Sequence, residues 1–241
     1  MFFIYFSLAI IVSFVFPVAA QGEERVRVQL TSFQQTTISS EISAKISSLP
    51  MREGASFKTD DILVNFDCSL LTSQRDKAVA TAKSAQETYT VNKRLEELGS
   101  IGKLELDQSV AKYNETKAEL ETMSTYVSKC TVRAPFTGRV AKLYTESHQY
   151  MTPGKQIMDI VDTEQIEVRL IVPSRWLKWL KIGSTFTVLI EEIGRTYKAT
   201  VIRINPRVDA LSQTVTLTGK IDGDRPELLP GMSGWAGFGK K

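Results

Sequence analysis

The sequence predicts a mainly β fold, in which a small β-sandwich is split by an antiparallel coiled-coil hairpin and followed by a small β-barrel. Three observations lead to this fold class. Residues 37–68 and 130–162 are two similar stretches of alternating apolar and polar residues, and residues 69–129 between them follow a helical pattern. Residues 163–241 contain short alternating segments separated by turn residues. Alternation with period two indicates half-buried strands, whereas apolar residues three or four apart indicate an amphipathic helix.

The composition is that of an ordinary globular protein. The chain has 241 residues, of which 42% are hydrophobic and 24% are charged, and its formal net charge is +3. So small a charge, without a run of five basic residues, does not indicate a nucleic-acid partner. The part after residue 20 is long enough for two small domains.

The first 20 residues contain no charged side chain and end in Val18-Ala19-Ala20, small residues that suit cleavage by a signal peptidase. We therefore expect residues 1–20 to be a secretory signal peptide. The stretch is also long enough to cross a bilayer, so an uncleaved membrane anchor is the alternative. In either case the remaining chain lies outside the cytoplasm, and residues 21–36 are expected to be a strand that leads into the barrel.

The two stretches that flank the helical pattern form a weak internal repeat of about 30 residues. Each contains a bend, a turn at Gly54 or Gly154, and a short apolar strand that ends at Asp67 or Asp162. Neither has enough apolar surface to fold alone, because small isolated sheets are only marginally stable. We therefore expect the two halves to pack into one sandwich, from which the segment between them projects.

Residues 69–98 and 104–129 are predicted to be two antiparallel helices, because they lack Pro and are rich in Ala, Glu, Lys, Gln and Leu. A turn at residues 99–102 separates them. The predicted seam consists of Leu71, Arg75, Ala78, Ala82, Ala85, Tyr89, Leu95 and Leu98 on the first helix and Leu106, Val110, Tyr113, Lys117, Leu120, Ser124 and Val127 on the second. Such a hairpin provides a contact surface at its tip or serves only as a spacer.

The two cysteines occupy equivalent places at the base of this hairpin. Cys68 follows the last strand of the first half, and Cys130 precedes the first strand of the second half. In an oxidising compartment such a pair is a candidate disulfide, which would close a loop of about 60 residues. Two buried free thiols are the alternative.

Residues 163–241 are predicted to form a small antiparallel β-barrel. The expected strands are residues 166–172, 185–190, 196–204, 213–221 and 234–238, with turns at Asn205-Pro206 and elsewhere. Ser174 is expected to cap a short helix over residues 175–180. Trp176 and Trp179 are expected to close the barrel end as core residues, and only in second place to contact a partner.

The sequence offers no constellation for catalysis. His148 is the only histidine, which leaves little support for a His-dependent triad or a two-histidine metal site. The turn Gly99-Ser100-Ile101-Gly102 joins two helices and is not a phosphate-binding loop. We therefore expect neither an enzyme nor a bound metal or cofactor.

In this order the segments resemble the membrane fusion proteins, the HlyD-like periplasmic adaptor subunits of tripartite efflux systems. Residues 131–140, TVRAPFTGRV, match the family segment that opens the second half of a lipoyl-like sandwich. Further matches in the right order are Glu53-Gly54 with Ile62-Leu63 and Phe66-Asp67, residues 205–209 with 214–217, and residues 228–234. The resemblance covers nearly all of the chain after residue 20. It implies a lipoyl-like β-sandwich interrupted by an α-hairpin, and then a β-barrel.

The chain departs from the family pattern at three turn or strand positions. Ala44 stands where the family usually carries Gly, and so does Thr59 or Asp60. His148 stands where a turn Gly is common. Gly tolerates unusual turn angles far better than His.

The resemblance implies a non-catalytic adaptor that is located in the periplasm and associated with the inner membrane. Its partners would be a resistance-nodulation-division type transporter in the inner membrane, a TolC-type channel in the outer membrane, and further copies of itself in a ring such as a hexamer. At the hairpin tip, Arg94 and Leu98 keep the spacing of the family's channel-contacting residues, and Gly102 aligns with a Ser of that motif. Because the chain stops directly after the barrel, we expect the barrel, with Trp176 and Trp179, to contact the pump.

Two other functions remain as alternatives. A lipoyl or biotinyl carrier would need a Lys at a sandwich turn, but the turn at residues 49–54 offers only Arg52. An envelope scaffold that works without a pump is poorly separated from the adaptor by sequence, and recovery of a transporter from membranes would distinguish the two.

Overall fold

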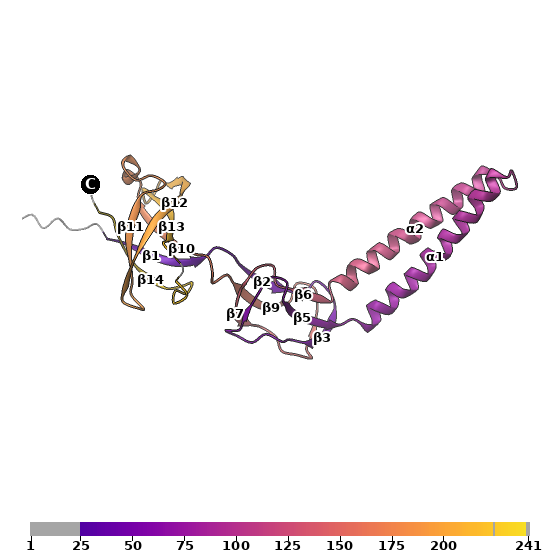
Figure 1. The fold of residues 1–241 in the computed structure, drawn as a ribbon, viewed down its shortest axis with the longest axis horizontal. Helices are drawn as coiled ribbons and strands as arrows, with labels where there is room; N and C mark the ends of the chain where they lie inside the picture. The colour runs from indigo at the N-terminus through magenta and orange to yellow at the C-terminus, as the bar shows by residue number, and fades with distance from the viewer. Residues whose placement is uncertain (1–24, 224, 240–241) are drawn as a thin grey trace, which may run out of the picture.

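The protein is elongated and consists of three parts arranged one after another (Figure 1). A computed structural model describes residues 25–223 and 225–239, so the predicted signal peptide lies outside the described residues. The barrel and the helical hairpin lie at opposite ends, and the sandwich lies between them. The predicted fold class is confirmed.

The sandwich consists of two four-stranded sheets, and each sheet takes two strands from either half of the repeat. Their orders are β2-β9-β7-β4 and β6-β5-β3-β8. The strands are β2 (Gln35–Ser39), β3 (Ala44–Ser48), β4 (Ser56–Phe57), β5 (Ile62–Asp67), β6 (Thr131–Arg133), β7 (Gly138–Leu143), β8 (Tyr150–Met151) and β9 (Gln156–Val161). One buried cluster, which includes Ile46, Leu63, Met151 and Ile160, lies between the sheets. Neither half could bury these side chains alone, as the repeat predicted.

The two halves are related by an internal pseudo-two-fold symmetry. Exchanging β2–β5 with β6–β9 in order converts the strand order of one sheet into that of the other. Hydrogen bonds repeat in the same way: the Gly54 N–H donates to the Val140 carbonyl at 2.8 Å, and the His148 N–H donates to the Ile46 carbonyl at 3.0 Å. The spacing from residue 54 to 148 equals that from 46 to 140, so one constant offset along the chain relates the halves.

Residues with positive φ also follow this symmetry. Gly54 (φ 80°) is equivalent to His148 (φ 70°), and Asp60 (φ 69°) is equivalent to Gly154 (φ 84°). In each pair only one member is a glycine, which adopts a left-handed backbone without steric cost. Asp and His are among the residues that tolerate this region best. The predicted departures from the family pattern at residues 60 and 148 therefore keep the turn geometry of a glycine.

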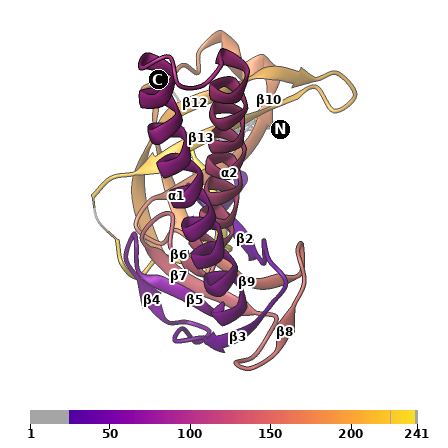
Figure 2. The ribbon, with the colours of Figure 1, turned by 90° about the vertical axis from the view of Figure 1, so that its right-hand side faces the viewer.

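The hairpin consists of α1 (Ser69–Glu97) and α2 (Lys103–Ser128), which lie side by side when viewed from the tip (Figure 2). On α1 the predicted seam holds as far as Tyr89, whose ring stacks on that of Tyr113 at 5.7 Å between centroids. Ala78 and Ala82 are buried in it. Leu98 was wrongly placed in the seam, because it is exposed beyond the last turn of α1.

The predicted seam on α2 is also partly wrong. Lys117 and Ser124 are exposed, and Ser109 and Thr116 are the buried residues. Both registers share residues 106, 113, 120 and 127, so spacing alone does not distinguish them. Burial of Ser109 and Thr116 is possible because their hydroxyls donate to the Leu106 and Lys112 carbonyls of the same helix, at 2.7 and 3.0 Å.

A disulfide joins Cys68 and Cys130 at the base of the hairpin, as the sequence suggested. The two Cα atoms are 6.1 Å apart, and the bridged residues are 62 positions apart in the chain. Next to the bridge, the Phe66 N–H donates to the Cys130 carbonyl at 2.9 Å. The bridge therefore links the residue directly before α1 to the second residue after α2, at the edge of the sandwich.

The barrel is closed, with the strand order β1-β10-β13-β12-β11-β14. Its strands are β1 (Arg25–Ser32), β10 (Ile166–Pro173), β11 (Thr185–Ile190), β12 (Arg195–Asp209), β13 (Thr214–Ile221) and β14 (Ser233–Gly237). β1 is a full barrel strand between β10 and β14. The segment 21–36, which was predicted to be one strand leading into the barrel, therefore belongs to two domains. The chain crosses from the barrel to the sandwich at residues 33–34, and β2 of the sandwich already begins at Gln35.

Two local predictions in the barrel region were wrong. Ser174 is the first residue of a short 3-10 helix, η1 (Ser174–Lys178), and no side chain caps this helix. Asn205 and Pro206 lie within β12, where the register against β13 shifts between Ile204 and Val208. A bulge accommodates Pro206 there, because a residue outside the ladder needs no N–H donor.

We expect the Cys68→Ser variant to unfold at a lower temperature than the wild type under oxidising conditions. In the loop-entropy model, a loop of this size contributes about 4 kcal/mol through the unfolded state. Thermal unfolding with and without reductant tests this, and reduced wild type should match the variant. A loss of the same size in the presence of reductant would instead indicate that the serine disturbs packing.

We also expect Gly138→Ala to destabilise the sandwich by about 1–3 kcal/mol, because a Cβ there would lie 2.2 Å from the Val161 carbonyl oxygen. The symmetry provides a matched control, since the equivalent residue is Ala44. Ala44→Gly should cost only about 1 kcal/mol. Equal losses in chemical denaturation would show that the two positions do not differ in this close contact.

Candidate functional site

The predicted channel-contact residues all lie at the tip of the hairpin. Arg94 and Leu98 are one turn apart, and the Leu98 N–H donates to the Arg94 carbonyl at 3.2 Å. Leu98 is 70% exposed, and Arg94 and Gly102 are also exposed. A positive φ at Gly99 ends the first helix, and Gly102 precedes α2. The tip therefore presents basic and large apolar side chains, among them Arg94 and Leu98, on a rigid support.

The two predicted pump-contact residues differ in burial. Trp176 is only 4% exposed and packs against Phe238, with ring centroids 5.3 Å apart. Trp179 lies over the same cluster, 5.3 Å from Trp176, but is 49% exposed. Trp176 is therefore a core residue, which agrees with the first of its two predicted roles, and a partner cannot reach it. Of the two side chains only Trp179 is available for contact.

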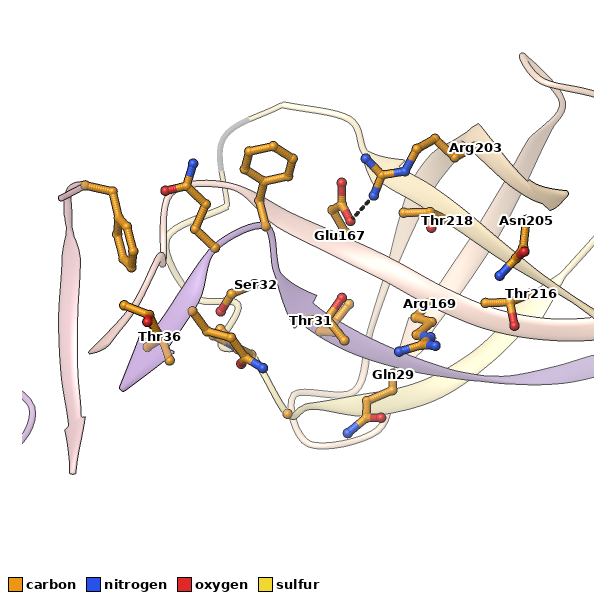
Figure 3. Close-up of a pocket in the computed structure, with 18 of the residues that line it drawn as sticks. Gln29, Thr31, Ser32, Thr36, Glu167, Arg169, Arg203, Asn205, Thr216 and Thr218 are labelled. Atoms are coloured by element: carbon orange, nitrogen blue, oxygen red, sulfur yellow. Dashed lines mark hydrogen bonds and ion pairs between the residues drawn. The ribbon is translucent and has the colours of Figure 1, made fainter. Parts of the chain in front are cut away.

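An open cleft of about 1390 Å³ separates the barrel from the sandwich (Figure 3). Its barrel wall is polar and is formed by outward-facing side chains of adjacent strands, among them Gln29, Arg169 and Thr218. Arg203 and Glu167 form an ion pair on this wall, with 2.6 Å between nitrogen and oxygen. Sequence reasoning missed this cleft because its lining comes from both domains and from segments far apart in the chain.

Among the described residues, two segments of the chain run between the barrel and the sandwich beside this cleft, and hydrogen bonds join these two segments to each other. The Phe33 N–H donates to the Gln165 carbonyl, and the Asp162 N–H donates to the Gln34 carbonyl, both at 2.9 Å. The buried Asp162 carboxylate also accepts the Glu164 and Gln165 N–H groups, at 2.8 and 3.0 Å. These hydrogen bonds fix the path of the chain at the junction between barrel and sandwich, and no covalent cross-link joins the two segments.

A second polar cluster surrounds Asp159 on the sandwich. The Thr37 and Tyr144 hydroxyls each donate to its carboxylate at 2.6 Å, which lowers the pKa of Asp159. The same bond raises the pKa of Tyr144. Pseudo-symmetry places Asn65 and Thr131 in the equivalent positions, and the Thr131 hydroxyl donates to the Asn65 side-chain oxygen at 3.1 Å. The cluster is thus a variant of a structural pair that occurs in both halves.

No group of three or more His, Cys, Asp or Glu side chains within the described residues could hold a metal ion. His148 lies in a turn, where its backbone has a positive φ of 70°. The two symmetry-related sandwich turns end in Glu53-Gly54 and Ser147-His148, so neither presents a Lys for a lipoyl or biotinyl group. Within residues 25–223 and 225–239, no helix has the length and apolar character needed to span a bilayer.

Comparison with curated proteins identifies relatives that are longer than this chain. The nodulation protein NolF of Rhizobium meliloti (strain 1021) is 28% identical over 226 residues, which cover 88% of this chain and 62% of NolF. The multidrug resistance protein MdtN of Escherichia coli (strain K12) is 29% identical over 97 residues, which cover 40% of this chain and 28% of MdtN. The chain therefore spans about three fifths of the length of NolF. No protein-family model matches it.

Solved structures share the fold of this chain. A MacA-MexA chimeric protein that contains the Pseudomonas aeruginosa MexA α-hairpin domain superposes with a TM-score of 0.75 at 20% identity, over 88% of this chain and 78% of the chimera. The membrane fusion protein Spr0693 from Streptococcus pneumoniae R6 superposes with a TM-score of 0.73 at 15% identity, over 90% of this chain and 99% of that one. The predicted resemblance to the membrane fusion proteins is confirmed.

We expect the Asp159 cluster to make stability depend on pH in the acid range. Because the pKa of Asp159 is lowered in the folded state, its contribution is present above the unfolded pKa of about 4 and is lost as pH falls through the folded pKa. Asp159→Asn should therefore lower the melting temperature by a few degrees at pH 7, and the difference should shrink as the pH falls toward about 2.5. A difference that stays constant from pH 7 to pH 2.5 would contradict this linkage.

Proposed function

We propose that this protein is the periplasmic adaptor of a tripartite efflux pump, which links an inner-membrane transporter to an outer-membrane channel without catalysing a reaction. The observation that carries this proposal is the placement of the hairpin tip and the barrel at opposite ends of one elongated molecule (Figure 1). The similarity to MdtN, a multidrug resistance protein, and the shared fold with a MacA-MexA chimera support an efflux role.

The hairpin tip would meet the outer-membrane channel. Leu98 directly follows α1, and its N–H bond to the Arg94 carbonyl keeps it one turn beyond Arg94. Gly102 lies next to them at the start of α2 and leaves space for a partner to approach. A TolC-type channel is the partner that this resemblance suggests.

The barrel would face the inner membrane and a resistance-nodulation-division type transporter. Its first described strand, β1, begins on the side of the barrel away from the sandwich, and β14 ends on that same side (Figure 1). An exported chain that emerges from the inner membrane near residue 20 would place this side closest to the bilayer. Trp179 is the exposed aromatic side chain there, so it replaces the pair Trp176 and Trp179 as the proposed pump contact.

The adaptor would act as a ring of identical copies, such as a hexamer, which seals and couples the two membrane proteins. This role needs a stiff arm, and the Cys68–Cys130 disulfide supplies one by fixing both ends of the hairpin to the sandwich. A disulfide is also consistent with an oxidising compartment such as the periplasm. No cofactor and no bond chemistry are required.

An envelope scaffold without a pump is the competing function, and a pull-down from detergent-solubilised membranes distinguishes the two. Recovery of an inner-membrane transporter with the tagged protein supports the adaptor. Recovery of envelope proteins without any transporter supports the scaffold.

We expect Arg94→Asp combined with Leu98→Asp to abolish drug export, because the pair reverses the charge and removes the apolar contact at the tip. Both side chains are exposed, so the protein should remain folded and present in the envelope. Export is measured as drug accumulation or minimal inhibitory concentration in cells that depend on this pump.

A matched control changes Lys83 and Val79 to Asp on the exposed shaft of α1. It introduces the same change of charge away from the tip and should preserve export. Normal export by the tip variant, at wild-type protein levels, would show that the tip does not contact the channel.

A further inference from the structure

An exposed patch of alternating apolar and basic residues lies at the far end of the barrel. We call it the distal barrel patch and define it as Leu177, Trp179 and Ile182 together with Arg175, Lys178 and Lys181. Ile182 is 66% exposed, Trp179 49% and Leu177 37%. Three large apolar side chains within six residues of a surface segment are more than scattered exposure, and such patches mark interaction sites.

The patch is rigid, so its exposure does not result from a loose loop. Between the exposed residues, Trp176 and Leu180 point into the barrel core and are buried. The Leu180 N–H donates to the Trp176 carbonyl at 2.8 Å, and the Ser184 hydroxyl accepts the Lys181 N–H at 3.0 Å. The two buried side chains and the two hydrogen bonds therefore anchor the segment to the barrel, while the residues of the patch remain in solvent.

The electrostatic character of the patch is positive. The segment from Pro173 to Ile190 contains three basic residues and no Asp or Glu. The neighbouring turn between β12 and β13 brings one carboxylate, Asp209, which accepts the Leu211 and Ser212 N–H groups of its own turn, at 3.0 and 2.9 Å. The Lys178 and Lys181 ammonium groups form no ion pair among the described residues, so they are available to an anionic partner.

The position of the patch relative to the start of the chain indicates what this partner is. Arg25 begins β1 directly opposite Gly237, next to Phe238, whose ring packs against Trp176 and Trp179. Only residues 21–24 separate Arg25 from the apolar stretch 1–20. Four extended residues span at most about 14 Å. Wherever that stretch enters a bilayer, the distal barrel patch lies close to the bilayer surface.

We infer that the distal barrel patch binds the surface of a membrane that contains anionic lipids. Trp179, Leu177 and Ile182 enter the interfacial region, where Trp side chains are favoured because they combine an apolar body with a polar N–H. Lys178 and Lys181 pair with phosphate groups of the lipid heads. Apolar insertion combined with basic residues is the pattern of proteins that lie on a membrane without crossing it. This inference does not depend on the proposed efflux role, and it assigns Trp179 to the lipid surface instead of to the pump.

The test uses the chain from residue 21 onward, so that the apolar stretch cannot supply the binding. Every described strand and helix and both buried cores lie between Arg25 and Phe238, so this chain retains the whole fold. Its cosedimentation is measured with vesicles of phosphatidylcholine alone and with vesicles that contain one part phosphatidylglycerol to two parts phosphatidylcholine. Thermal unfolding verifies that each variant is folded.

We expect binding to the anionic vesicles only, and a loss of that binding at high salt. Replacing Lys178 and Lys181 by Gln should weaken partitioning about thirtyfold, since each basic residue near such a surface contributes about fivefold. Ile182→Asp and Trp179→Ser should each weaken it at least tenfold. Ile182 keeps the test independent of folding, because it packs against neither of the two buried cores. Leu104→Asp, an equally exposed leucine at the hairpin end, is the matched control and should bind as the wild type does.

Three results would overturn the inference. Equal binding to both kinds of vesicle would show that the patch does not recognise anionic lipid, and binding that Ile182→Asp and Trp179→Ser leave unchanged would show that another surface binds. Binding to native inner-membrane vesicles but not to protein-free vesicles would assign the patch to a membrane protein such as the transporter. None of these results depends on drug export, so failure here is separable from failure of the proposed function.

Discussion

The structure depends on the pairing of strands between the two halves of the sandwich. β5 pairs with β6 across the hairpin insertion, and β2 pairs with β9 across most of the described chain. These two ladders are equivalent under the pseudo-two-fold. Because neither half completes a sheet without the other, the hairpin must leave and re-enter at one edge, and the barrel must attach at the symmetry-related edge. The three-part layout is therefore a consequence of one internal symmetry.

The same symmetry shows how the two attachments differ. The spacing that relates Gly54 to His148 also relates Cys68 to Asp162, the residues at which the chain leaves the sandwich toward the hairpin and toward the barrel. At Cys68 the exit is closed by a covalent bond to Cys130. At Asp162 it is closed only by hydrogen bonds to Gln34, Glu164 and Gln165, beside an open cleft. Hydrogen bonds exchange with water at small net cost, whereas a disulfide does not open in an oxidising compartment. The hairpin is thus held to the sandwich by a covalent cross-link, whereas the junction with the barrel has only hydrogen bonds in the equivalent place.

Burial explains which side chains of the barrel end are available to partners. Trp176 completes an aromatic cluster with Phe186 and Phe238, which fills the open end of the barrel. Trp179 covers that cluster from outside and keeps about half of its surface in solvent. Trp176 lies within η1 and Trp179 directly follows it, so two tryptophans three residues apart have different roles, one in the core and one on the surface.

The sequence by itself determined the fold class, the order of the three parts and the strand-turn chemistry of the repeat, and it made the two cysteines candidates for a disulfide. These features are local or periodic. Turn residues such as Pro50 and Gly54 and the alternation of apolar and polar residues in the strands are sufficient to predict them. Only the tertiary structure decided the seam register of α2, the burial of Trp176 against the exposure of Trp179, the division of residues 21–36 between two domains, and the cleft between them. The α2 pattern satisfied two registers, and the packing of α2 against α1 selected the one with Ser109 and Thr116 inside. Such choices depend on which surfaces meet, and that is decided by contacts between segments far apart in the chain.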